Sequence, residues 1–293
     1  MGKRNISKNN ILNALIFLKE NVELSVSDGV SGNSIQKIGS GLEDYIKDLF
    51  SDTLKIKSKA VKKKAHFKVF AYAGNSNNPP DMILKNGDAI EVKKVDSLTA
   101  SIQLNSSPPK ACLLASDTRI NKTCRELALK ENWTQKDIFY AVGSVGKDKL
   151  LTRLWFIYGD CFAAEHGVYE KAAQRITGAI SQSFDKTELS DTNELAVVPK
   201  IDPLGITRLR VRGMWIVKNP AVVFEDIIPK SRKDAMFRAY CLLLDSKYLS
   251  FPEESRLKFE AQLDDKMIMN KVQISDPNNP VKLIEARIIS YEV

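Results

Sequence analysis

The chain contains only two histidines and four cysteines among its 293 residues. His66 and His166 are far apart, and their neighbours form neither a metal-binding histidine pair nor a Ser-His-Asp arrangement. The cysteines are scattered without a Cys-x-x-Cys pair and are Cys112, Cys124, Cys161 and Cys241. This scarcity favours reduced core thiols and argues against zinc hydrolases, histidine-based nucleases and serine hydrolases. Any catalysis must therefore rest on carboxylates and lysine.

The sequence also lacks a hydrophobic run as long as a membrane span, and no signal-peptide core follows its first residues. We therefore expect a soluble, cytoplasmic protein with no membrane partner. Lys and Arg number 44 while Asp and Glu number 36, which gives a formal net charge of +8 at pH 7. This basic balance favours a polyanionic partner, although charge alone does not distinguish nucleic acid from an anionic membrane surface.

The order of hydrophobic patterns predicts an α/β fold. Residues 9–23 have the apolar spacing of a helix, and a Ser- and Gly-rich loop is expected at residues 26–37. Ser40 and Glu43 form a capping box that would open a second helix. Strands are expected at residues 67–72, 111–115, 137–143, 154–159 and 281–293, a helix with one apolar side at 168–184, and a boundary at 185–193.

Two short apolar runs, at residues 82–84 and 89–93, are separated by a turn that contains Asn86 and Gly87. An Asn-Gly turn between such runs is the strongest local signal for a β-hairpin. Alternate side chains of a strand share a face, so the Glu and Lys of the second strand would point to the same side. The hairpin therefore predicts a site on one of its faces.

The residues on that face are Asp81, Glu91 and Lys93. Ile90 and Val92 would face the core, while Asp81 opens the first strand and can reach the same side as the other two. Two carboxylates beside an ammonium group suit Mg²⁺ and a phosphate, because Mg²⁺ prefers hard oxygen ligands. The alternative is a solvent-exposed hairpin that carries this pattern by chance.

A dense basic stretch precedes the hairpin. Its members are Lys55, Lys57, Lys59, Lys62, Lys63 and Lys64. The stretch is either a solvated charged face or a clamp that contacts phosphates.

The arrangement around Pro80, Asp81, Glu91 and Lys93 resembles the core of the PD-(D/E)XK nuclease superfamily, and specifically its type II restriction endonucleases. A helix precedes these strands and a further helix and strand follow them, so the resemblance covers about residues 39–115. It implies Mg²⁺-dependent cleavage of double-stranded DNA at a short specific sequence, usually by a homodimer. A cognate DNA methyltransferase is expected in the same system, since an unprotected nuclease would destroy the host chromosome.

The resemblance extends to one subgroup of these enzymes. Residues 105–110 and the strands of Tyr140 and Trp155 resemble the subgroup that cuts short G/C-rich sites such as GGCC. We expect residues 1–293 to form one elaborated nuclease domain with a central mixed β-sheet flanked by helices. Its catalytic core would span about residues 39–115, and C-terminal elements at about 190–293 would serve DNA recognition and dimerisation.

The family's catalytic roles apply to four residues of this sequence. Asp81 and Glu91 would bind Mg²⁺ together with the scissile phosphate, and Lys93 would orient the attacking water and offset the developing charge. Lys94 points to the opposite face of the strand, so Lys93 is preferred. A carboxylate of the preceding helix often joins the site, and Glu43 is the candidate. Its capping-box position leaves a purely structural role open.

Recognition requires other side chains. Arg208, Arg210 and Arg212 alternate with apolar residues, so a strand would project them from one face. Arginine is the preferred reader of guanine in the major groove, while phosphate contacts or pairing with acidic residues are the alternatives. Further candidates follow the catalytic strand and are Gln103, Asn105, Ser106, Ser107 and Lys110.

Three hypotheses remain. The first is a site-specific restriction endonuclease, and the second is a repair or recombination nuclease of the same fold that reads DNA structure. The third is a DNA-binding protein without catalysis. The intact acidic residues and lysine argue against the third, and the arginine-rich segment favours the first over the second.

Overall fold

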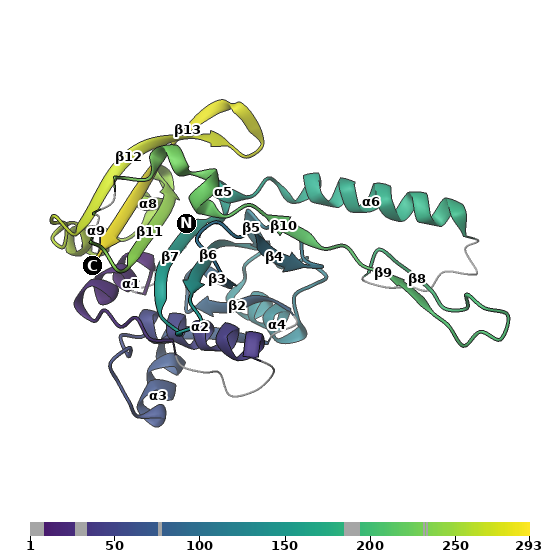
Figure 1. Cartoon of the computed structure of the whole chain (residues 1–293), viewed down its shortest axis with the longest axis horizontal. Helices are drawn as coiled ribbons and strands as arrows, with labels where there is room; N and C mark the ends of the chain where they lie inside the picture. Colours follow the sequence, from purple (N-terminus) through teal and green to yellow (C-terminus); the bar gives the residue numbers. More distant parts are fainter. Residues whose placement is uncertain (1–8, 27–33, 76–77, 185–193, 231, 233) are drawn as a thin grey trace.

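A mixed β-sheet forms the centre of the protein (Figure 1). The computed structural model describes residues 9–26, 34–75, 78–184, 194–230, 232 and 234–293. The strands lie in the order β1 (Phe70–Asn75), β2 (Asn78–Leu84), β3 (Ala89–Val95), β6 (Gln135–Val145), β7 (Leu151–Tyr158), β11 (Arg238–Leu244), β13 (Asn279–Glu292) and β12 (Met267–Asp276). The ninth strand of this sheet, β5 (Cys112–Leu114), pairs with β6 but is not part of this linear order. Pairs β3–β6 and β7–β11 are parallel and their neighbours antiparallel, which confirms the expected mixed sheet.

Helices flank the sheet, as expected. Those of the first half are α1 (Ile11–Glu20), α2 (Ser34–Phe50), α3 (Lys59–Val69), α4 (Lys122–Glu131), α5 (Gly159–Phe162) and α6 (His166–Ser183). Those of the second half are α7 (Pro220–Val223), the 3₁₀ helix η2 (Glu225–Ile227), α8 (Asp245–Ser250) and α9 (Glu253–Glu260). Two small two-stranded sheets join β4 (Ile102–Asn105) to β10 (Trp215–Val217) and β8 (Ala196–Val198) to β9 (Leu209–Val211).

The predicted hairpin is present as β2 and β3. Met82 pairs with Ile90 in an antiparallel register, and Asn86 adopts a left-handed conformation with φ of 53° in the turn. Ile90 and Val92 are buried, whereas Glu91 lies on the other face and is half-buried. The local signal was sufficient here because both strands and the turn are contiguous in the sequence.

The predicted start of the second helix is wrong. α2 begins at Ser34, so Ser40 and Glu43 lie inside the helix and do not form its N-terminal cap. A capping-box pattern involves only four residues, whereas most helical stability in proteins comes from packing of an apolar face. Leu42 and Ile46 of α2 are fully buried in the core. The structural role considered for Glu43, helix capping, is therefore excluded.

The sheet face opposite α2 is lined by aromatic side chains. The ring centroids of Trp155 and Tyr240 are 4.6 Å apart, and Phe224, which follows α7, packs on Trp155. Trp155 is only 1% exposed, so it belongs to the core. The four cysteines are free thiols, and among the described residues no helix is both long and apolar enough to cross a bilayer.

An arm extends from this body. Figure 1 shows α6 and the β8–β9 hairpin pointing away from the sheet together, with β4 and β10 at the base of the arm. The helix was expected at residues 168–184 with an apolar side, and it is present, but none of its residues is buried. At the far end of the hairpin Leu204 and Ile206 are 83% and 81% exposed. The predicted boundary at 185–193 lies outside the described residues.

Candidate active site

The candidate site lies on β2 and β3. Asp81 is in the middle of β2, and its Oδ2 atom accepts a hydrogen bond of 2.6 Å from the backbone N–H of Val92. The bond fixes the carboxylate of Asp81 across the hairpin, beside β3. The structure thus brings Asp81 to the strand that carries Glu91 and Lys93.

Glu91 and Lys93 form an ion pair on the same face of β3. The Nζ atom of Lys93 is 2.7 Å from Oε1 of Glu91, and both side chains are largely buried. The other carboxylate oxygen, Oε2 of Glu91, is buried and has no hydrogen-bond partner among the described residues. A buried carboxylate oxygen without a partner is costly. Glu91 therefore has one atom available to a ligand.

The charges of this site influence one another. Burial and the neighbouring Glu91 raise the pKa of Asp81 well above its usual value. Burial alone would lower the pKa of Lys93, but the carboxylates of Glu91 and Asp81 raise it, so the ammonium stays protonated. Lys94, on the opposite face, pairs with Asp96 instead. The site holds two close carboxylates, and one lysine does not balance their charge.

Glu43 adds a third carboxylate from α2. Burial raises the pKa of Glu43, Lys93 lowers it and Glu91 raises it further, so these groups share one electrostatic environment. The close approach of α2 to the sheet depends on Gly143 in β6. A Cβ atom at Gly143 would lie 2.7 Å from a methyl carbon of Leu42, the residue before Glu43. The absent side chain therefore lets α2 lie close against the sheet, on the face opposite Glu91 and Lys93.

The donor set fits a hard divalent cation. Asp81 and Glu91 offer carboxylate oxygens, and the free Oε2 atom of Glu91 is the observation that supports a ligand here. No group of three or more Asp, Glu, His or Cys side chains in the described part of the chain is arranged to hold a metal by itself. A cation such as Mg²⁺ fits, because it keeps several waters and is often held by one or two carboxylates together with substrate phosphate.

The loop after β4 lies beside this site. Ser107 and Lys110 line a small hollow together with Glu91 and Tyr140. Lys110 is itself buried, and its ammonium binds Asp117, so Lys110 does not offer its charge to DNA. The sequence indicates the strand of Tyr140 but gives the Tyr140 side chain no role at the site. Its hydroxyl accepts from the backbone N–H of Lys110 at 2.6 Å and so holds the loop.

Gln103, Asn105 and Ser106 are exposed at the base of the arm. β4 pairs with β10, and Asn105 lies opposite Trp215. Because β10 follows the arm's hairpin in the chain, this pairing joins the loop beside the candidate site to the arm. These three side chains are free to contact a ligand that lies along the base of the arm.

The three candidate arginines are on the arm, where Arg210 is in β9 and Arg208 and Arg212 flank this strand. Arg210 and Arg212 both bind Glu194, so two of the guanidinium groups share one side and one carboxylate. The alternative of pairing with acidic residues therefore holds for these two. Arg208 is exposed, and no ion pair of Arg208 occurs within the described ranges. The sequence does not reveal Glu194 as the partner, since it lies well before the arginines.

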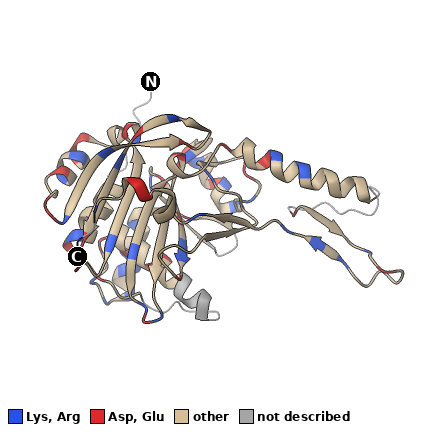
Figure 2. Cartoon of the chain, turned by 45° about the horizontal axis from the view of Figure 1, so that its top comes forward, with Lys and Arg blue, Asp and Glu red and all other residues tan. Residues whose placement is uncertain are grey.

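The basic stretch before the hairpin forms the segment that leads into α3 and α3 itself. Lys62 is half-buried and binds Asp48 of α2, whereas Lys55, Lys63 and Lys64 are exposed. Figure 2 shows Lys and Arg over much of the molecule and not on one face alone. The exposed lysines of α3 thus form one part of a generally basic surface.

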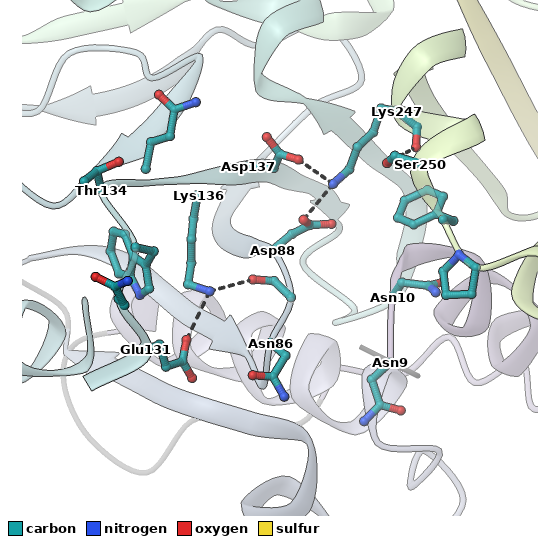
Figure 3. A pocket seen from close by; sticks show the side chains of 16 residues that line it. Asn9, Asn10, Asn86, Asp88, Glu131, Thr134, Lys136, Asp137, Lys247 and Ser250 are labelled. Atoms are coloured by element: carbon teal, nitrogen blue, oxygen red, sulfur yellow. Dashed lines mark hydrogen bonds and ion pairs between the residues drawn. The ribbon is translucent and has the colours of Figure 1, made fainter. Parts of the chain in front are cut away.

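A second cluster of two carboxylates and one lysine lies at the turn end of the same hairpin (Figure 3). The Nζ atom of Lys247 is 2.7 Å from Oδ1 of Asp88 and 2.6 Å from Oδ2 of Asp137. Burial alone would lower the pKa of Lys247, but the two carboxylates raise it. Lys136 donates to the backbone oxygen of Gly87 nearby, at 3.2 Å. This cluster binds the C-terminal part of the chain to the hairpin.

Comparisons with known proteins identify the family of the chain. The family model described as NgoPII restriction endonuclease matches residues 9–275. A relative from Neisseria gonorrhoeae, named type II restriction enzyme NgoPII, is 39% identical over 285 residues, which cover 97% of this chain and 100% of the relative. No solved structure matches the chain. The chain is therefore a nuclease and belongs to the NgoPII restriction endonuclease family.

Proposed function

We propose that this protein cuts double-stranded DNA at a short specific sequence in a Mg²⁺-dependent reaction, as a type II restriction endonuclease of the PD-(D/E)XK superfamily. The observation that carries the proposal is the grouping of Asp81, Glu91 and Lys93 on one hairpin, with Oε2 of Glu91 buried and free of a partner within the described residues. Membership of a restriction endonuclease family supports the same reaction.

Each residue has a role in this proposal. Asp81 and Glu91 would hold Mg²⁺, which, when bound, polarises the scissile phosphate and acidifies a water. Lys93 is kept protonated by its carboxylate neighbours, so it would orient the attacking water and stabilise negative charge and would not act as a base. Glu43 would add negative charge to the site from α2, and Asp81 is held in place by the N–H of Val92.

The proposed target is G/C-rich, with GGCC as the candidate sequence. Arginine reads guanine through its O6 and N7 atoms, and Arg208 is the exposed member of the arm's arginines. Gln103, Asn105 and Ser106 are exposed beside the candidate site and are the proposed polar contacts. Ser107 lines the hollow next to Glu91 and would contact the DNA backbone.

The proposed active form is a homodimer, because two strands must be cut and a two-fold assembly places one site on each. The exposed Leu204 and Ile206 at the end of the arm support association with another protein surface. Residues 1–293 would act as one nuclease domain, with a core at about 39–115 and recognition elements at about 190–293. A cognate DNA methyltransferase would protect the host.

The decisive experiment is digestion of a long, fully sequenced, unmethylated DNA by the purified full chain, with and without Mg²⁺. We expect discrete fragments only with Mg²⁺, whose mapped ends give the recognition sequence. Glu91→Ala and Lys93→Ala should each lose at least about a thousand-fold in cleavage rate, since each removes a group that acts on the transition state.

The matched control is Glu126→Ala, which removes an exposed carboxylate of α4 and should cut like the parent protein. A smear of products, or nicking that depends on DNA structure, would favour a repair nuclease and contradict the proposal. Full activity of Glu91→Ala would show that the site has been placed wrongly.

A further inference from the structure

Two arginines lie side by side on the central sheet. Arg153 of β7 and Arg238 of β11 are directly opposite each other in a parallel register. Like charges at directly opposite positions destabilise a sheet. Such a pair therefore calls for a physical reason.

Their charges are not fully compensated. The Nε atom of Arg153 is buried without a hydrogen-bond partner within the described residues. The Nε atom of Arg238 forms an ion pair with Oε1 of Glu292 at 3.4 Å, and its Nη2 donates to the backbone oxygen of Arg232 at 2.9 Å. Arg153 forms no ion pair with any described carboxylate, in contrast to Arg238. The guanidinium group of Arg153 is thus the one whose charge is left uncompensated within the described residues.

Burial makes this arrangement costly. Arg153 is half-buried, and burial lowers its pKa, with a further contribution from the charge of Arg238. Guanidinium groups present planar sets of donors that match the oxygens of a phosphate. An anion held between Arg153 and Arg238 would provide acceptors for N–H groups of the Arg153 guanidinium and balance its charge.

The pair is on the same face of the sheet as Lys93. Lys93 lies opposite Val142, and Val142 lies opposite Trp155, so these three side chains share a face. Arg153 is two residues from Trp155 on β7 and therefore points to that face as well. The arginine pair and the candidate site consequently border the same side of the molecule.

The separation suits one strand of DNA. Arg153 lies two strands and two residues from Lys93, which is roughly 12 Å between Cα atoms for strands about 4.8 Å apart. A DNA strand winds around its helix axis while it advances about 3.4 Å per nucleotide along that axis, so the straight distance between phosphates grows faster than the axial rise. A phosphate a few nucleotides from the scissile one is therefore within reach of Arg153.

We infer that Arg153 and Arg238 form a phosphate-binding site that holds the DNA backbone a few nucleotides from the cleaved bond. The inference rests on the proposed cleavage of duplex DNA and adds a fixed second contact on the same sheet face. The two arginines position the strand and do not take part in the chemistry. Phosphate contacts of this kind fix register without reading sequence.

The test measures binding of a cognate duplex without Mg²⁺, as a function of salt, for the parent protein, Arg153→Met and Arg238→Met. Methionine keeps much of the apolar stem and removes the charge. We expect each variant to bind about tenfold more weakly and to have a shallower salt dependence, by about one unit of slope for each lost phosphate contact. Lys271→Met, which removes an exposed charge on β12, is the matched control and should bind like the parent.

A second measurement locates the contact. A series of duplexes carries one uncharged methylphosphonate at successive positions of the cleaved strand. The parent should lose affinity at one or two positions a few nucleotides from the cleavage point, and Arg153→Met should lose this sensitivity. Arg153→Lys keeps the positive charge and should retain part of the sensitivity to the methylphosphonate. Thermal melting checks that every variant is folded.

The outcomes separate the two proposals. If the parent cleaves DNA while both methionine variants keep its salt slope and methylphosphonate profile, the arginine site is refuted and the proposed function stands. If the parent does not cleave, the proposed function fails, and the binding profile alone then decides whether the arginines hold a phosphate.

Discussion

The β2–β3 hairpin carries two clusters of the same composition, and they differ in what their charges contact. At the turn end, Lys247 lies within 2.7 Å of both Asp88 and Asp137, and no buried polar atom of these three lacks a partner in the described structure. On the strand face, Lys93 binds one oxygen of Glu91 and leaves the other without a partner among the described residues.

The difference distinguishes a structural cluster from a site. Asp88, Asp137 and Lys247 come from distant parts of the chain, and their charges are paired with one another. This cluster therefore holds those parts of the chain together. Asp81 and Glu91 are close to each other with only Lys93 between them to compensate, and such an excess of buried carboxylate is typical of a place where a cation binds. Composition alone does not separate the two cases.

The largest effect should come from Asp81→Asn. It should reduce cleavage at least about a thousand-fold, because the amide is a poor ligand for a divalent cation. In metal-free buffer it should nevertheless raise the free energy of unfolding by about 1 kcal/mol at neutral pH, since it removes a buried charge next to Glu91.

The stability gain has a defined pH dependence. The pKa of Asp81 is raised in the folded protein, so its ionised form costs stability at high pH and its protonated form does not. The gain of Asp81→Asn should therefore disappear as the pH falls through the raised pKa of Asp81. Urea unfolding at several pH values with EDTA measures this, and added Mg²⁺ should stabilise the parent alone. If the Asp81→Asn protein were less stable than the parent in EDTA, the inference that the site holds an excess of buried carboxylate charge would be refuted.

Lys247→Met should show the opposite pattern. It leaves two carboxylates facing each other without their cation and should lower the free energy of unfolding by about 3 kcal/mol. The cleavage rate of the folded fraction should stay near that of the parent, because the cluster is at the turn end of the hairpin. Lys258→Met removes an exposed pairing with Glu254 and should change stability by less than about 0.5 kcal/mol. Equal melting temperatures for Lys247→Met and Lys258→Met would contradict a structural role.

Glu43→Gln should have the smallest effect. It removes a charge that acts on Lys93 and Glu91 from outside the hairpin, and a reduction of kcat by about tenfold is expected, as for supporting groups around a metal. The free energy of unfolding should rise slightly at neutral pH in metal-free buffer, because burial raises the pKa of Glu43 and its ionised form therefore costs stability. Asp44→Asn, on the same helix and more exposed, is the control and should cut normally. A kcat of Glu43→Gln equal to that of the parent would remove Glu43 from the site.

Sequence reasoning succeeded where the determinants are local. Asn86 and the alternation around Glu91 lie within about a dozen residues of each other, so the hairpin and the common face of its acidic residues and lysine could be predicted. The strands of Tyr140 and Trp155 were likewise recognisable from their continuous apolar runs.

It failed where the ion-pair partner of a residue is distant in the sequence, or where the tertiary environment determines what a helix packs against. Lys110 resembles a free cation in the sequence, but its charge is bound by Asp117, and Arg210 and Arg212 are bound by Glu194. The apolar side of α6 indicates a helix packed on a core, yet the helix lies on an arm and buries none of its residues. Periodicity identifies the amphipathic helix and does not say what covers it.

The contact between Gly143 and Leu42 constrains how this enzyme can change over time. Any side chain at position 143 would meet the methyl groups of Leu42, which is fully buried and has little room to move. A larger residue at 143 is therefore compatible with the present helix position only if a smaller one replaces Leu42. The two positions lie on separate elements, and we expect them to vary together in evolution. A substitution at only one of them should shift α2 relative to the sheet.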